Sequence, residues 1–307
     1  MKDAWWGVII GDYMKDIETT LRACAADPVS AMKRYDELWT EIVTVARKDM
    51  SKIVPTLEKI AREIAKIPLR KSMKDAPKVL IVGEIYVRRD DFAVDELVGL
   101  LAKRGIIAKV SGVAEWLYYC DYTRRHDLEK RLALIPWYAR PFSKEFREII
   151  MWKVEEKYKH HVDHKIKKAL GLSGLIPETP HNMKEIMGNA NSMFVSPDLY
   201  SEISISSGAA STALQSDFSG VINISPFACL IGRVIEGLVT PWARERNFPM
   251  MSVEIDGDVL SPNLINKLEI FMLNVLRFRT DAEGSELVEK TDSKVTSLDR
   301  RIQRDEV

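Results

Sequence analysis

The sequence predicts an α/β protein with flavodoxin-like or Rossmann-like parallel sheets, because short apolar runs alternate with segments of helical length. The continuous apolar run at 79–82 is typical of a strand that is buried on both faces. A helical segment at 92–103 and a second apolar run at 106–110 follow it, which makes a βαβ unit with parallel strands. The alternation returns near the C-terminus, where we expect strands at 220–224 and 249–255 and a helix at 229–246.

The N-terminal part is predicted to be helical over residues 12–70. A first helix ends near Ala26, and Pro28 begins the next, where its missing N–H costs nothing. Apolar residues three and four positions apart form one stripe from Trp39 to Ile67, which indicates a core face or a partner surface more than a coiled coil. Pro55 interrupts this stripe and should kink the helix or split it in two.

The remaining segments complete the prediction of structure. Residues 113–190 read as a mainly helical insertion that is rich in aromatic residues and holds four of the five histidines. A short strand is expected at 192–195, a helix at 196–214 and a last helix at 262–278. The tail from 280 to 307 is polar and is predicted to be disordered.

The chain is long enough for two domains at roughly 150 residues each. We expect four regions: a helical N-terminal region (1–74), a first βα module with the helical insertion (75–190), a second βα module (191–279) and the polar tail (280–307).

Composition excludes several classes of protein. The 45 Lys and Arg balance the 45 Asp and Glu, which argues against a nucleic-acid binder driven by bulk charge. No apolar run reaches the roughly 18 residues of a membrane-spanning helix, and the N-terminus lacks the pattern of a signal peptide. Three dispersed cysteines do not form a disulfide framework, so a cytoplasmic protein with reduced thiols is expected.

Sites in open parallel sheets form beyond the carboxyl ends of the strands. Glu84 and Arg88 follow the first strand and Asp256 follows the last, so these three are candidate catalytic residues. The alternative, given about equal weight, is that Glu84 and Asp256 only cap helices or accept hydrogen bonds from loop amides.

The cysteines are candidate metal ligands. Cys229 opens a helix, whose N-terminus favours the thiolate form that iron–sulfur clusters require, although a lone cysteine is more often a small buried hydrophobe. Cys120 follows a group of aromatic residues, and core packing is its alternative. Cys24 lies within a helix, where a structural role is favoured.

Other motifs are weaker. His160 and His164 share one helical face and could bind a metal, but the surrounding charges favour a solvated surface. The segment 206–211 lacks the pattern of a phosphate loop, and a G-x-S-x-G nucleophile elbow is absent.

Two long segments carry a family resemblance. The run GVINISPFACLIGRVIEGLVTPWARERNFPMMSVEIDGD (220–258) resembles the C-terminal part of the 2-hydroxyacyl-CoA dehydratase and benzoyl-CoA reductase superfamily, and is closest to its large CoA-enzyme activase-related proteins. The run KVLIVGEIYVRRDDFAVDELVGLLAKRGIIAKVSGVAEWLYYC (78–120) is similar to their GEIYVRxDPFAN segment. Together the resemblance covers about residues 75–278.

The resemblance implies a [4Fe–4S] cluster that is held by three dispersed cysteines in a flavodoxin-like fold. It also implies an ATP-dependent activase that delivers an electron for dehydration or reduction of acyl-CoA thioesters. Cys229 matches the cysteine of the PFxC motif, and Cys120 matches one that follows the EW-L motif. The family's first cysteine lies upstream of the helical region and Cys24 does not obviously replace it, while Ile231 stands where the family has proline.

The leading hypothesis is therefore an iron–sulfur subunit or domain of such a dehydratase or reductase, in an oligomer. Cys120 and Cys229 would hold the cluster, with a third ligand from Cys24, from a companion subunit or from another type of group. The alternatives are a cluster-free scaffold that docks a catalytic partner through its helical stripe, and a small-molecule enzyme that uses Glu84 and Asp256.

Overall fold

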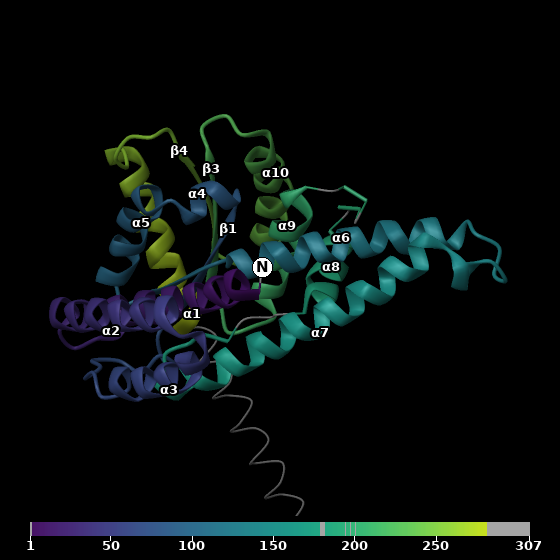
Figure 1. Cartoon of the computed structure of the whole chain (residues 1–307). Coiled ribbons are helices and arrows are strands. Elements are labelled where there is room, and N and C mark those ends of the chain that lie inside the picture. Colours follow the sequence, from purple (N-terminus) through teal and green to yellow (C-terminus); the bar gives the residue numbers. More distant parts are fainter. Residues whose placement is uncertain (1, 179–181, 194, 197, 200, 281–307) are drawn as a thin grey trace, which may run out of the picture.

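The computed structural model confirms the α/β prediction with one sheet of parallel strands (Figure 1). It describes residues 2–178, 182–193, 195–196, 198–199 and 201–280. In this part of the chain four strands lie in the order β2-β1-β3-β4. They are β1 (Lys78–Gly83), β2 (Ile107–Val110), β3 (Gly220–Pro226) and β4 (Met250–Ile255).

The two βα modules share this sheet, because the first strand of each lies at its centre. β1 pairs with β3 from Val79 opposite Gly220 to Gly83 opposite Ile224. All six residues of β1 are buried, as the unbroken apolar run predicts for a central strand.

Helices cover both faces of the sheet. On one face α5 (Asp91–Lys103) and a helix at 262–280 bury apolar side chains that include Leu97 and Phe271. The other face is covered by α8 (Met183–Ser192), α9 (Glu202–Leu214) and α10 (Leu230–Glu245).

The N-terminal helices form a second core, together with α6 (Val113–Ala133) and α7 (Lys144–Leu170), beside the edge strand β2. They are α1 (Lys2–Cys24), α2 (Pro28–Lys48) and α3 (Ile53–Ile64). The first helix begins ten residues earlier than the expected start at residue 12, since Trp5 and Ile9 extend its buried face toward the N-terminus. The predicted split near Pro55 is confirmed: a 3₁₀ turn, η1 (Met50–Lys52), separates α2 from α3.

The helical insertion is confirmed as a long hairpin. α6 (Val113–Ala133) and α7 (Lys144–Leu170) run side by side and project away from the sheet (Figure 1). Two 3₁₀ turns, η2 (Arg140–Phe142) and η3 (Gly171–Ser173), lie at the hairpin's tip and at the end of α7.

Two predictions about the following segment were wrong. Ser192 is the last residue of α8, so no strand starts there, and the helix expected from residue 196 begins at Glu202 after its N-cap, Ser201. The tail predicted to be disordered lies almost entirely outside the described residues.

Candidate functional site

The carboxyl ends of β1 and β3 lie side by side at the point where the strand order reverses. β2 flanks β1 and β4 flanks β3, so the chain winds outward in both directions from this pair. Such a switch point is where open parallel sheets form their ligand crevices. Gly83 ends β1 with φ +115°, and a Cβ there would collide with the Ile224 carbonyl. Only glycine fits at this closely packed position.

Glu84 follows Gly83 and caps the short helix α4 (Ile85–Arg89). Its Oε2 accepts a hydrogen bond from the Val87 amide at 2.9 Å. The Glu202 carboxylate, from the start of α9, accepts from the Ile85 amide at 3.2 and 3.4 Å. Two carboxylates therefore occupy the N-terminus of α4. The hydrogen bond of Glu84 agrees with the alternative interpretation, in which this residue caps a helix.

Arg88 lies in the same place, with its side chain only 1% exposed. Its Nη1 is 3.8 Å from Oε1 of Glu115, in the first turn of α6. The Nε and Nη2 atoms of Arg88, and Oε1 of Glu115, have no hydrogen-bond partner within the part of the chain that the structure describes. The structure thus brings Glu84 and Arg88 together and adds Glu115 and Glu202.

Charge and burial oppose each other in this group. Burial lowers the pKa of Arg88, while the carboxylates of Glu115, Glu202 and Glu84 act against that shift. Burial raises the pKa of Glu202; Arg88 opposes this and Glu84 adds to it. One guanidinium among three carboxylates can hold α4, α6 and α9 together, and Glu202 takes up a proton more readily than an ordinary glutamate.

A further carboxylate fills the N-terminus of α6. Asp12, on α1, accepts hydrogen bonds from the amides of Val113 at 3.1 Å and Ala114 at 2.8 Å. It also forms an ion pair with Arg89. A Cβ on Gly112 would lie 2.5 Å from the Asp12 carboxylate, so this approach needs glycine. Asp12 could not be recognised as a site residue from the sequence, because no local pattern shows that α1 lies against α6.

Asp256 lies apart from this group. It is exposed in the turn after β4, and β3 stands between β4 and β1. Its Oδ1 accepts a hydrogen bond from the Asp258 amide at 3.2 Å. The contacts of Asp256 therefore agree with the alternative interpretation, in which its carboxylate only accepts a hydrogen bond from a loop amide.

Cys229 and Cys120 belong to helices that follow strands at the carboxyl edge. Cys229 is the half-buried N-cap of α10, and its side chain makes no capping hydrogen bond. Cys120 is half-buried in α6, where burial and the nearby carboxylates of Asp121 and Glu202 raise the pKa of its thiol. Tyr119, next to Cys120 in sequence, and Ile231, two residues after Cys229, pack in the same apolar cluster.

Cys24 is not brought together with them. It is fully buried and packs with Ala76, Ala102 and Ile107, at the amino ends of β1 and β2. Among the described residues no group of three or more His, Cys, Asp or Glu side chains is placed to hold a metal ion. Cys120 and Cys229 both lie on helices that follow the carboxyl ends of strands, and within the described residues no third metal ligand lies with them.

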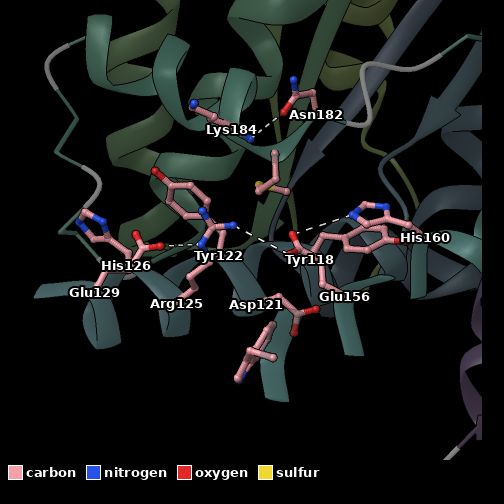
Figure 2. Close-up of a pocket in the computed structure, with 12 residues that line it drawn as sticks. Tyr118, Asp121, Tyr122, Arg125, His126, Glu129, Glu156, His160, Asn182 and Lys184 are labelled. Carbon is pink, nitrogen blue, oxygen red and sulfur yellow. Dashed lines mark hydrogen bonds and ion pairs between the residues drawn. The ribbon is translucent and has the colours of Figure 1, made fainter. Parts of the chain in front are cut away.

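A cavity of about 690 Å³ lies between one face of α6, one face of α7 and the start of α8 (Figure 2). Arg125 reaches across it, with Nε 2.8 Å from Glu129 and Nη1 3.9 Å from Glu156. His160 stacks on Tyr118 with ring centroids 5.0 Å apart. This cavity could not be predicted from the sequence, because its walls come from three helices whose packing no local pattern reveals.

Comparison with known proteins adds no relative: no family model, no curated protein and no solved structure matches the chain. Fold and site define an α/β protein with a parallel sheet whose switch point holds three carboxylates, two of them half-buried, around one buried arginine. No helix within the described ranges has the length and apolar character needed to cross a membrane.

Proposed function

We propose that the chain is the cysteine-bearing subunit or domain of a 2-hydroxyacyl-CoA dehydratase or acyl-CoA reductase type of system. In this proposal Cys120 and Cys229 supply two ligands of a [4Fe–4S] cluster, and the other ligands come from outside the described residues. The observation that supports it is the placement of these two cysteines, which match the family motifs, on helices that follow the strands' carboxyl ends.

In this proposal the cluster is shared with a companion subunit or another segment, because the third cysteine lies too far away to bind it. Cys24 is buried at the opposite edge of the sheet and cannot reach Cys229 without unfolding the packing around Ala76 and Ile107. A companion subunit, or a segment not described here, must then provide what the cluster lacks. The ATP-dependent activase and the acyl-CoA substrate belong to the same proposal.

The chain's own residues have defined tasks in this proposal. When bound, the cluster would supply low-potential electron transfer. Cys120 must lose its proton to become a ligand, and the carboxylates of Asp121 and Glu202 oppose that loss. Cys229 stands at the N-terminus of α10. Iron loading should therefore rise with pH, because Cys120, whose pKa is raised, must be deprotonated to bind iron.

The test is iron and acid-labile sulfide per chain after anaerobic purification, read with the visible spectrum. We expect about four iron atoms per cluster and a broad band that dithionite bleaches. Cys120→Ala and Cys229→Ala should each lose most of the iron. Cys24→Ala is the matched control and should keep it. Full iron in Cys229→Ala, or loss only in Cys24→Ala, would contradict the proposal.

A second candidate is a cluster-free α/β module that docks a catalytic partner. The observation that favours it is the set of exposed apolar side chains on the α6–α7 hairpin: Leu134, Trp137, Tyr138, Phe142, Ile150, Met151 and Val154. A colourless chain that refuses reconstitution, and whose assembly survives replacement of all three cysteines by alanine, would favour this candidate over the first.

A further inference from the structure

The end of the α6–α7 hairpin presents large apolar side chains to solvent. We call residues 131–147 the hairpin tip. Within it Trp137 is 78% exposed and Phe142 is 88% exposed, and Leu134 and Tyr138 are also exposed. Figure 1 shows the tip at the far end of two long helices, away from the sheet. Exposed aromatic side chains gathered on one projecting element are typical of a protein interaction site.

The connection at the tip is held by hydrogen bonds, and the tip has a positive formal charge. The Nε and Nη2 of Arg140 donate to the carbonyls of Ile135 at 2.9 Å and Ala133 at 3.2 Å, which ties the connection to the end of α6. The Ser143 hydroxyl accepts from the Phe146 amide and caps α7. The tip contains four cationic residues and one acidic residue, a formal charge of +3. The cations are Arg131, Arg140, Lys144 and Arg147, and two of them pair with acids just outside the tip.

A complementary surface lies on the same chain, beside the carboxyl edge of the sheet. Segments 90–96 and 254–259 contain seven acidic residues and no Lys or Arg. The Leu260 amide donates to Oε2 of Glu96 at 3.0 Å, which holds the two segments side by side. We call these two segments, with Phe227 and Leu230 next to them, the acidic rim.

The acidic rim is also apolar. Phe227 is 70% exposed and its amide donates to the Ile255 carbonyl at 2.8 Å, which places it against the second acidic segment. Phe92 and Val259 are likewise exposed. Three of the seven acids form ion pairs within the chain, whereas Asp256 and Asp258 are exposed and make no ion pair within the described residues. The rim thus combines exposed apolar side chains with the negative charge of these two carboxylates.

We infer that the hairpin tip of one copy of this chain docks on the acidic rim of a second copy. Both surfaces have exposed apolar centres, and their charges are opposite, which is the arrangement that orients specific protein contacts. A chain cannot cover its own rim, because the tip and the ends of α5 and β4 lie on opposite sides of the molecule (Figure 1). Two copies about a two-fold axis make the contact twice and close a dimer.

This inference goes beyond the proposed function and does not rest on iron. It predicts that the second copy covers Phe227 and Leu230, the exposed neighbours of Cys229. Because self-association is measured on the chain without added iron, its failure and the failure of the cluster proposal are separate results.

The test is sedimentation equilibrium of the full chain with charge-reversed variants. Lys144→Glu with Arg147→Glu changes the formal charge of the tip from +3 to −1, and Asp256→Lys with Asp258→Lys changes that of the rim from −7 to −3. We expect wild type to self-associate at about 100 µM, and each variant to associate at least roughly tenfold more weakly. An equimolar mixture of the two variants should recover part of the association, because the unaltered tip of the rim variant can dock on the unaltered rim of the tip variant.

The matched control is Lys165→Glu with Lys168→Glu, near the other end of α7, where both side chains are exposed. It changes the net charge as the tip variant does and should leave association unchanged. Far-ultraviolet circular dichroism confirms that each variant is folded. A wild-type chain that stays monomeric, or a variant mixture that fails to associate, would overturn the inference. Binding of the monomer to phosphatidylserine vesicles through the tip would overturn it in favour of a membrane surface.

Discussion

Lys109 on β2 and Asp16 on α1 form a buried ion pair, with Nζ 2.7 and 2.5 Å from the two carboxylate oxygens. Both side chains are almost completely excluded from solvent. This pair joins the N-terminal helices to the edge of the sheet, so the helical region and the sheet should unfold together.

Removing one member of this pair leaves a buried charge without a counterion. We expect Lys109→Met to lower the free energy of unfolding by about 3–5 kcal/mol. The double variant Lys109→Met with Asp16→Leu should recover much of that loss, since both charges are then removed. Urea denaturation followed by circular dichroism measures these values. Equal losses in the single and double variants would show that the lone charge is not the cause.

Gly83 should not tolerate a side chain. Its positive φ and the Ile224 carbonyl behind it predict that Gly83→Ala lowers the free energy of unfolding by about 3 kcal/mol or more. Gly99 is the matched control, because it lies within α5 and a Cβ there would meet nothing within 4 Å. Gly99→Ala should instead stabilise the chain by roughly 0.5–1 kcal/mol. Thermal melts of the two variants give opposite shifts if this is correct.

Glu202 should contribute measurably to the pH dependence of the free energy of unfolding. Burial raises its pKa in the folded chain, so the folded state binds this proton more tightly than the unfolded state does. The contribution of Glu202 to stability is therefore greatest below its unfolded pKa and falls as pH rises through the folded value. Glu202→Gln keeps an acceptor for the Ile85 amide and should flatten that fall. Identical pH profiles of unfolding for both proteins would rule out this role.

Thiol reactivity should separate the three cysteines. Cys24 is fully buried, whereas Cys120 and Cys229 are partly accessible. Ellman's reagent should therefore modify two thiols per native chain, and the third only after denaturation. The raised pKa of Cys120 predicts that its modification speeds up as the pH increases above neutral. Rapid modification of all three thiols in the native chain would contradict the packing around Cys24.

The strands were predictable because each is short, apolar and bounded by a break in pattern. The four expected strands of the βα modules match β1 to β4 within a few residues. The strand expected at 192–195 was wrong because the pattern of a four-residue apolar segment does not distinguish a helix end from a strand.

The candidate site was only partly predictable. Glu84 and Arg88 follow a strand directly, so their place at the carboxyl edge could be deduced. Glu115 and Glu202 could have been flagged from their places in the first turns of helices, where acids are common. Their meeting at Arg88 is a long-range contact that needs the relative positions of α4, α6 and α9.

Asp12, Glu84 and Glu202 occupy helix N-termini that, in other sheets with this winding, bind the phosphates of nucleotides. The chain thus supplies its own anions where a related architecture would recruit a cofactor. A phosphate-binding site could therefore evolve here in few steps. A single Asp12→Gly change would remove the carboxylate from the start of α6 while keeping Arg89 and Gly112 beside it. Directed evolution toward a phosphate-binding protein could begin from that one substitution.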